Sequence, residues 1–316
     1  MSELRKDYIF DKWVIISEKR SKRPNEYKKH TINSNNLNSK TCFFCPGNEK
    51  KTGKETLKVT DSKGNWIIRC FENKFSAVTT RHRGKLRTKS ILTSVPAYGY
   101  AEVIAETPSH TKQLTDLPTS HIKTLLEVYS KRISFYAKNK YINYVSVFKN
   151  HGREAGASII HSHSQLIAYS QVPRNIRDEI QVLKSHKVCP YCKIIKLESN
   201  SKRMCFSNQN FVAIAPFASA YQYEVSIYPK KHLKSITQLN QKELFDLASI
   251  LKKVLLKLKE IDAPYNMYMH GAHHHQNIHF HIEIKPRLNI FAGFELETGT
   301  IINTVSPEKA ALFYRK

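Results

Sequence analysis

Two stretches of the chain, IIHSHSQLIA at residues 159–168 and NIHFHIEIKP at residues 277–286, decide the fold. Each carries a His-x-His pair within a run of mostly apolar and β-branched residues, which is typical of a strand. Because alternate residues of a strand share a face, the first stretch places His161, His163 and Gln165 on one side. The second stretch repeats this with His279, His281 and Glu283. The residues that alternate with these three point to the other face and into a core: Ile278, Phe280, Ile282 and Ile284.

The same order of motifs precedes both strands and forms an internal repeat. A C-x-x-C pair comes first, as CFFC at residues 42–45 and CPYC at residues 189–192. A stretch rich in Val, Ile and Tyr follows in each copy, AYGYAEVIAETPSH at residues 97–110 and AYQYEVSIYPKKH at residues 220–232. An amphipathic helix comes next, with apolar faces from Ile122 to Tyr136 and from Leu244 to Leu258. The repeat predicts an α+β fold of two similar halves, residues 1–175 and 176–316, each an antiparallel sheet with a covering helix.

Composition narrows the class of protein. The 316 residues are enough for two domains, and no stretch has the 18 or so apolar residues of a membrane span. The start, MSELRKDYIF, has charges where a signal peptide would be apolar, so we expect a cytoplasmic protein. With 51 Lys+Arg against 26 Asp+Glu, the net charge is +25, which suits phosphate-bearing partners or simply a solvated basic surface. The charge is spread along the chain, which disfavours a nucleic-acid-binding arm.

The cysteines and histidines of the repeat predict two metal sites. In a chain without a secretion signal, C-x-x-C pairs indicate metal ligands or a redox couple. Pro46-Gly47 after the first pair favours a loop and hence a metal. Each half supplies two Cys and two His, a closed tetrahedral shell that is typical of structural zinc. The predicted ligands are Cys42, Cys45, His110 and His161 in one site, and Cys189, Cys192, His232 and His279 in the other. His281 is an alternative fourth ligand of the second site.

If His161 binds metal, His163 remains on the same strand face as a candidate catalytic nucleophile. An imidazole attacks phosphorus at neutral pH without a strong base, provided that its tautomer is held and donors stabilise the phosphoryl oxygens. Gln165 can donate one such hydrogen bond. The preceding NHGREAGAS, residues 150–158, has small residues that let backbone N–H groups approach a phosphate closely.

At this point the sequence resembles the galactose-1-phosphate uridylyltransferase family, a two-domain branch of the histidine triad superfamily. The resemblance runs nearly end to end, through LRKDYIFDKWVIISEKRSKRP, CFFCPGNE, FENKFSAV, NHGREAGASIIHSHSQ, HFHIEIKPR and FAGFELETGT. It implies two histidine-triad-like halves whose antiparallel sheets form a half-barrel, and a homodimer.

The resemblance also implies a ping-pong nucleotidyl transfer. His163 would attack the α-phosphorus of a nucleotide sugar and release a sugar 1-phosphate, and a second phosphate-bearing acceptor would then take the nucleotide. By position in matching motifs, residues on several segments would contact the nucleotide and its phosphates: Arg20, Arg23, Asn73, Asn150, Gly156, Ser158 and Gln165. Phe294 and Glu295 would lie near the sugar phosphate, contributed across the dimer.

Several positions depart from typical bacterial uridylyltransferases. Ser162 and Ser164 stand where those enzymes have Pro and Gly, Lys74 where they have Asp, and Ile301, near Thr300, where they have a Gln that grips the hexose phosphate. The Ser-containing strand, the second C-x-x-C and GFELETG look more like the ADP-glucose phosphorylase branch. Three functions therefore stay open: uridylyl transfer between UDP-glucose and galactose 1-phosphate, adenylyl transfer with inorganic phosphate as acceptor, and a basic zinc-bearing nucleic-acid-binding protein. The spacing from Cys45 to His110 is far from that of a C₂H₂ finger and disfavours the third.

Overall fold

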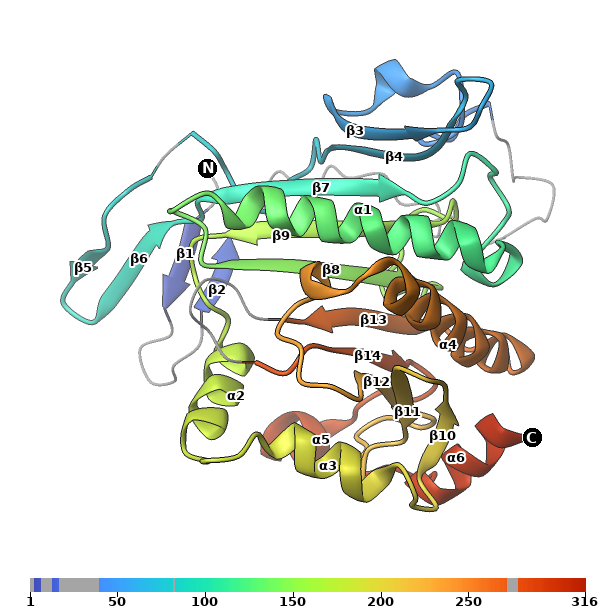
Figure 1. The fold of residues 1–316 in the computed structure, drawn as a ribbon. Coiled ribbons are helices and arrows are strands. Elements are labelled where there is room, and N and C mark those ends of the chain that lie inside the picture. Colours follow the sequence, from blue (N-terminus) through green and yellow to red (C-terminus); the bar gives the residue numbers. More distant parts are fainter. Residues whose placement is uncertain (1–2, 7–12, 17–39, 82, 272–277) are drawn as a thin grey trace. The chain divides into compact units, whose positions relative to one another are not determined.

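The computed structural model describes residues 3–6, 13–16, 40–81, 83–271 and 278–316 (Figure 1). Arg20, Arg23 and the histidine run at residues 273–275 lie outside these ranges. The chain forms two compact units: residues 1–112, 132–147 and 158–181 make up the first, and residues 113–131, 148–157 and 182–316 the second. Helix α1 (Thr119–Ala137) and strand β8 (Tyr144–His151) each have residues in both units. Among the described residues, every helix is too short or too polar to span a bilayer.

The first unit contains two antiparallel sheets. The smaller has the order β2-β1-β6-β5, from β1 (Glu3–Lys6), β2 (Trp13–Ile16), β5 (Arg87–Lys89) and β6 (Leu92–Pro96). The larger runs β3-β4-β7-β9, from β3 (Glu55–Thr60), β4 (Trp66–Glu72), β7 (Gly99–Ala105) and β9 (His163–Tyr169). The loop that carries the first C-x-x-C precedes β3, and its buried side chains pack with Trp66, Phe71 and Val103 of this sheet.

The register of β7 against β9 decides which side chains share a face. Ala105 is opposite His163, and Val103 is opposite Gln165, so these four lie on one face. Glu102 and Ile104 lie on the other face, opposite Leu166 and Ser164. On that second face, the fully buried Glu102 carboxylate accepts hydrogen bonds from Arg132 and Tyr136 at the end of α1.

The second unit has the strand order β10-β11-β12-β14-β13, from β10 (Met204–Ser207), β11 (Phe211–Ile214), β12 (Val225–Pro229), β14 (His281–Pro286) and β13 (Tyr265–His270). Helix α4 (Gln241–Glu260) contacts β10, β11 and α6 (Pro307–Arg315). It begins at a capping box in which the Asn240 side chain accepts from the Glu243 N–H and the Glu243 carboxylate accepts from the Asn240 N–H. Helices α2 (Arg174–Lys184), α3 (Pro190–Glu198) and α5 (Gly293–Thr298) complete the chain.

Antiparallel sheets with separate helices confirm the predicted α+β class. The apolar faces predicted for α1 and α4 are buried, as are Ile278, Phe280, Ile282 and Ile284. Both His-x-His strands begin later than the pattern predicts, at His163 and His281. The pairing of β7 with β9 ends at Ala105 and His163, and the pairing of β12 with β14 ends at Ile227 and Ile282. The boundary after residue 175 and the half-barrel stay predictions.

Candidate active site and metal centres

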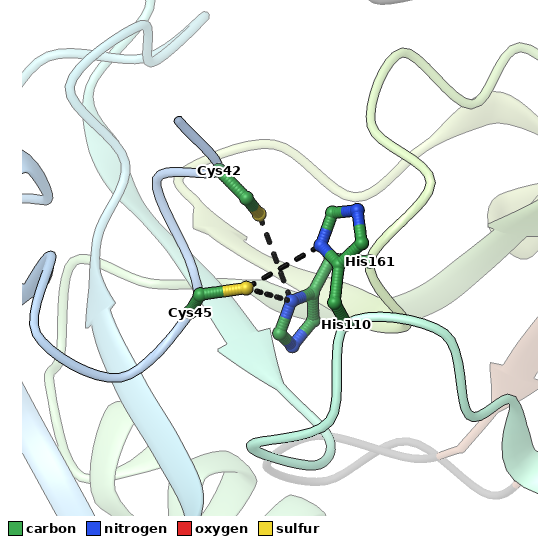
Figure 2. A group of neighbouring side chains, drawn as sticks. All are labelled: Cys42, Cys45, His110 and His161. Carbon is green, nitrogen blue, oxygen red and sulfur yellow. Dashed lines mark hydrogen bonds between the residues drawn. The ribbon is translucent and has the colours of Figure 1, made fainter. Parts of the chain in front are cut away.

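The first unit brings Cys42, Cys45, His110 and His161 together, with their ligand atoms all within 4.8 Å of one another (Figure 2). The His161 Nδ1 lies 3.6 Å from the Cys42 Sγ and 3.5 Å from the Cys45 Sγ. The His110 Nδ1 lies 3.3 Å from the Cys45 Sγ. Asn48 shapes the loop locally, because its side-chain amide donates to the Cys42 carbonyl at 2.8 Å and its backbone N–H donates to the Cys45 carbonyl at 3.1 Å.

The second unit holds an equivalent group of Cys189, Cys192, His232 and His279, whose ligand atoms also lie within 4.8 Å of one another. The His279 Nδ1 lies 3.8 Å from the Cys189 Sγ and 3.6 Å from the Cys192 Sγ, and the His232 Nδ1 lies 3.5 Å from the Cys192 Sγ. Unlike the first pair, these cysteines begin a helix, with Cys189 as the residue before α3. Each group can therefore hold a metal ion with two sulfur and two nitrogen ligands.

In each group, the first histidine of the His-x-His pair places its Nε2 against a backbone carbonyl oxygen. The His161 Nε2 lies 2.7 Å from the Thr107 carbonyl oxygen, and the His279 Nε2 lies 3.1 Å from the Pro229 carbonyl oxygen. A hydrogen bond from Nε2–H to a carbonyl leaves the Nδ1 lone pair for a metal, which is the usual support of a metal-bound imidazole. Burial lowers the pKa of His279 to about 4, so this ring is neutral at pH 7, as a ligand must be.

His163 opens strand β9 with its ring held in one orientation. Its Nδ1 lies 2.8 Å from the His161 carbonyl oxygen, and the side chain is 8% exposed. Because a carbonyl only accepts, this contact places the proton on Nδ1 and the ring lone pair on Nε2. The Phe44 ring meets the His163 ring edge to face, with their centroids 5.2 Å apart.

The other predicted site residues of the first unit lie on the same or neighbouring strands. Gln165 is half-buried, two residues after His163 on the same face of β9. Asn73 follows β4, where its N–H donates to the Ala101 carbonyl and its side-chain oxygen accepts from the Phe75 N–H. Ser158 is half-buried ahead of β9.

The remaining predicted residues belong to the second unit. The Asn150 side-chain oxygen accepts a hydrogen bond from the Asn266 amide at 2.9 Å. Gly156 is exposed with φ +82°, a conformation that favours glycine. Phe294 and Glu295 lie on α5, where Phe294 is 51% exposed and the Glu295 carboxylate accepts from the Ala292 N–H.

His281 is the structural copy of His163 in the second unit. Its Nδ1 lies 2.8 Å from the carbonyl oxygen of His279, two residues earlier, just as in the first unit. The surroundings of its Nε2 differ, since the Glu283 carboxylate lies 3.6 Å away. Burial alone would raise the pKa of Glu283, but His281, His270 and Lys285 hold that pKa well below its usual range. The copy therefore faces an anion, which repels a phosphate, where His163 is followed by the neutral Gln165.

Two residues of the first site escaped the sequence analysis. Phe44 lies between the two cysteines of the loop, and the C-x-x-C motif predicts a role for the cysteines only. Glu106 is a buried acid that binds Ser162, between His161 and His163. Its only signal in the sequence is an acidic residue at the end of the apolar run AEVIAE.

Comparison with known proteins places this geometry in a family. The model for the galactose-1-phosphate uridyl transferase N-terminal domain matches residues 1–173, and one for a domain of unknown function (DUF4921) matches residues 113–311. An ADP-glucose phosphorylase of Arabidopsis thaliana is 34% identical over 99% of this chain and 92% of its own. A galactose-1-phosphate uridylyltransferase of Thermotoga maritima is 28% identical over 98% of this chain and 97% of its own.

A solved structure agrees with the sequence matches. The crystal structure of an ADP-glucose phosphorylase from Arabidopsis thaliana with bound ADP-glucose has a TM-score of 0.79 and 32% identity, covering 100% of this chain and 99% of the other. The family model spans more than half of the chain, and a relative above 30% identity spans nearly all of it. The chain therefore belongs to the galactose-1-phosphate uridyl transferase family, a family of nucleotidyltransferases.

Proposed function

We propose that the protein transfers a nucleotidyl group through a covalent nucleotidyl-histidine at His163. The observation that carries this proposal is the 2.8 Å contact from the His163 Nδ1 to the His161 carbonyl, which fixes the tautomer that a nucleophile needs. Gln165, on the same face, supplies a donor for a non-bridging phosphoryl oxygen. Asn73, Ser158, Asn150 and Gly156 are proposed to contact the nucleotide and its phosphates, as are Arg20 and Arg23.

The proposed reaction has two displacement steps. In the first, the His163 Nε2 attacks the α-phosphorus, a P–N bond forms, and the P–O bond to the β-phosphate breaks, releasing the sugar 1-phosphate. In the second, an oxygen of a phosphate-bearing acceptor attacks the same phosphorus, and the P–N bond breaks. The ring nitrogen needs no base, because Nε2 carries a lone pair and the proton stays on Nδ1, which donates it in a hydrogen bond to the His161 carbonyl.

The substrate pair proposed first is UDP-glucose with galactose 1-phosphate. The matching family model and the Thermotoga maritima relative, both described as galactose-1-phosphate uridyl transferases, support it. The second candidate is ADP-glucose with inorganic phosphate as acceptor. It is supported by the 34% identity to the Arabidopsis thaliana ADP-glucose phosphorylase, against 28% for the uridylyltransferase, and by Ser162 in the His-x-His strand.

Both Cys₂His₂ groups are proposed to bind structural zinc. Zn–S bonds of about 2.3 Å and Zn–N bonds of about 2.0–2.1 Å, arranged tetrahedrally, separate sulfur from nitrogen by about 3.5 Å. The six S···N distances given above run from 3.3 Å to 3.8 Å. With four protein ligands, neither ion would have an open position for a reacting water. Zinc would therefore stabilise the segments that carry its ligands and take no part in the transfer.

A homodimer in the cytoplasm completes the proposal. Phe294 belongs to a run of exposed apolar side chains with Ile290 and Leu296, which are 94% and 73% exposed. Covering this run by a second copy would bring Phe294 and Glu295 to the partner's sugar phosphate. The six cysteines are free thiols, as expected for metal ligands in a reducing compartment. Sedimentation of the wild type and of Phe294→Asp tests the assembly, and a wild type that sediments as a monomer would contradict it.

Intact-mass measurement tests the chemistry. The wild type, His163→Ala and His281→Ala are each incubated briefly with UDP-glucose and, separately, with ADP-glucose. We expect a nucleotidyl adduct on the wild type and on His281→Ala, the matched control with the same Nδ1 contact, and none on His163→Ala. A uridylyl adduct supports the first substrate pair and an adenylyl adduct the second. An adduct that persists on His163→Ala, or none on the metal-replete wild type, would refute the proposal.

A further inference from the structure

The residue between the metal-binding His161 and the nucleophile His163 is tied to a buried acid. The Ser162 hydroxyl donates to a Glu106 carboxylate oxygen at 2.5 Å, and the Glu106 N–H donates to the Ser162 carbonyl at 3.1 Å. Glu106 is 0% exposed and Ser162 is 2% exposed. These two bonds extend the pairing of β7 with β9 one residue beyond Ala105 and His163.

This pair lies on the sheet face opposite the nucleophile. Ala105 and His163 share one face, so their neighbours Glu106 and Ser162 point to the other, the face on which Glu102 is buried. A substrate bound at the His163 Nε2 therefore does not meet the Glu106 carboxylate. The two bonds to Ser162 give Glu106 a route to the reaction through the Ser162 backbone.

The backbone next to Ser162 is what orients the nucleophile. The His161 carbonyl, which joins directly to the Ser162 nitrogen, accepts the hydrogen bond from the His163 Nδ1. Thr107, the residue after Glu106, binds the His161 side chain, because its carbonyl accepts from the His161 Nε2 at 2.7 Å. Two hydrogen bonds therefore hold the backbone around the His161 carbonyl. One joins the His161 ring to Thr107, and the other joins the Ser162 hydroxyl to Glu106.

The second unit shows that the metal group does not need such a pair. There Phe280 stands between His279 and His281, is 1% exposed, and donates only its backbone N–H to the Leu233 carbonyl at 2.7 Å. The Cys₂His₂ arrangement and the His281 Nδ1 contact are nevertheless the same. At the position of Ser162 the second unit has Phe280, which has no hydroxyl to bind an acid. A buried carboxylate is costly unless it is hydrogen-bonded, so an apolar residue would be the cheaper choice for packing alone.

We propose that Glu106 is a positioning residue for nucleotidyl transfer. By binding the Ser162 hydroxyl it fixes the His161 carbonyl and, through it, the His163 ring in line with the α-phosphorus. This inference rests on the proposed function in that it assigns a role at the same site. A small displacement of a reacting group lowers a rate by about ten-fold or more.

The test compares variants that each remove one hydroxyl donor from a buried carboxylate, Glu106 directly after β7 or Glu102 within it. Ser162→Ala removes the donor to Glu106, whereas Tyr136→Phe, the matched control, removes the donor to Glu102 at 2.7 Å on the same face. Rapid-quench intact mass gives the rate of adduct formation, and steady-state kinetics separate kcat from KM. We expect Ser162→Ala to lose about ten-fold in rate with KM and zinc content unchanged, Ser162→Thr to recover most of it, and Tyr136→Phe to keep the wild-type rate.

A double-mutant cycle with Glu106→Gln completes the kinetic test, because partners in one bond give non-additive effects. Equal rate losses in Ser162→Ala and Tyr136→Phe, or additive effects of Ser162→Ala and Glu106→Gln, would overturn the proposal. A readout independent of activity is the ¹⁵N resonance of the His163 ring, which reports the protonated Nδ1. We expect this signal to shift or broaden in Ser162→Ala and not in Tyr136→Phe. If the wild type forms no adduct but the signal still changes, the proposed function fails while the positioning holds; an unchanged signal refutes the positioning itself.

Discussion

Phe44 and His163 meet edge to face, with ring centroids 5.2 Å apart and an interplanar angle of 65°. Phe44 lies between Cys42 and Cys45. The loop that carries these two cysteines therefore also packs against the His163 ring. The same ring contacts His161, with centroids 6.0 Å apart, and Phe71, at 5.4 Å. His161 and His163 therefore pack against the same ring, and this ring belongs to a buried cluster that also contains Cys42, Cys45 and Phe71.

Replacing Phe44 with Leu should slow the formation of the nucleotidyl-histidine without releasing metal. An aromatic pair contributes about 0.5–1.5 kcal/mol beyond its buried area, so we expect a two- to ten-fold fall in rate, where about 1.4 kcal/mol is a factor of ten. Rapid-quench intact mass measures the rate, and metal analysis measures the zinc. Phe43→Leu, the neighbouring and less buried phenylalanine of the same loop, serves as the control. Loss of zinc from Phe44→Leu would instead show that the ring supports the loop alone.

The two metal groups should differ in what their loss does to the reaction. We expect Cys42→Ser and Cys189→Ser each to lose one of two bound zinc ions and to lower thermal stability, since structural zinc contributes directly to folding. Only Cys42→Ser should also abolish adduct formation, because its group includes His161, whose carbonyl orients His163. Metal analysis, thermal unfolding and intact mass on both variants check this. Equal loss of adduct in the two would show that zinc acts on the whole fold rather than on the nucleophile strand.

Glu102 and Arg132 form a buried ion pair beneath the same sheet. The Arg132 guanidinium donates to both carboxylate oxygens, at 2.9 Å and 2.6 Å, and Tyr136 adds a third bond at 2.7 Å. Arg132→Ala leaves a carboxylate of 0% exposure without its cation, which should lower the free energy of unfolding by about 3–5 kcal/mol. Glu102→Gln combined with Arg132→Met should recover much of this loss, because both charges are then absent. Urea unfolding of the three proteins measures it, and a double variant no more stable than Arg132→Ala would contradict the assignment.

The two Cys₂His₂ groups were predictable because the sequence contains their motifs twice. One His-x-His is weak evidence, but the order C-x-x-C, His, His-x-His in both halves picks out the eight residues that the structure gathers into two groups. Ser162 and Glu106 lie 56 residues apart, and only the register of β7 against β9 joins them. Such a pair has no periodicity along the chain. The role of Phe44 could not be predicted for a similar reason, since its contact with His163 depends on the path of the loop before β3.

The late start of β9 and β14 is a property of strand pairing that the apolar alternation does not contain. Ahead of these strands, ring nitrogens of two histidines contact the neighbouring backbone: the His161 Nε2 lies 2.7 Å from the Thr107 carbonyl oxygen, and the His279 Nε2 lies 3.1 Å from the Pro229 carbonyl oxygen. Side-chain periodicity alone cannot show this, because it describes one strand and not its partner.

Glu243 should make the stability of the second unit dependent on pH. Burial by itself would raise the pKa of Glu243, but the Lys231 ammonium, 2.7 Å away, and the Asn240 N–H hold that pKa below its usual value. An acid whose pKa is lower in the folded than in the unfolded state stabilises the fold above the unfolded pKa of about 4.3, and this contribution disappears as the pH falls through the folded value.

Glu243→Gln keeps the shape of the capping box but removes the charge. Since Lys231 is 60% exposed, we expect a loss of about 0.5–1 kcal/mol at pH 7, close to that of other exposed pairs and caps. Urea midpoints of the wild type and the variant, compared at each pH from neutral downward, should converge once Glu243 is protonated. Lys231→Gln should show the same convergence, because it removes the cation that lowers this pKa. A gap between wild type and Glu243→Gln that stays constant into the acid range would mean that the carboxylate contributes through shape and hydrogen bonding, and not through its charge.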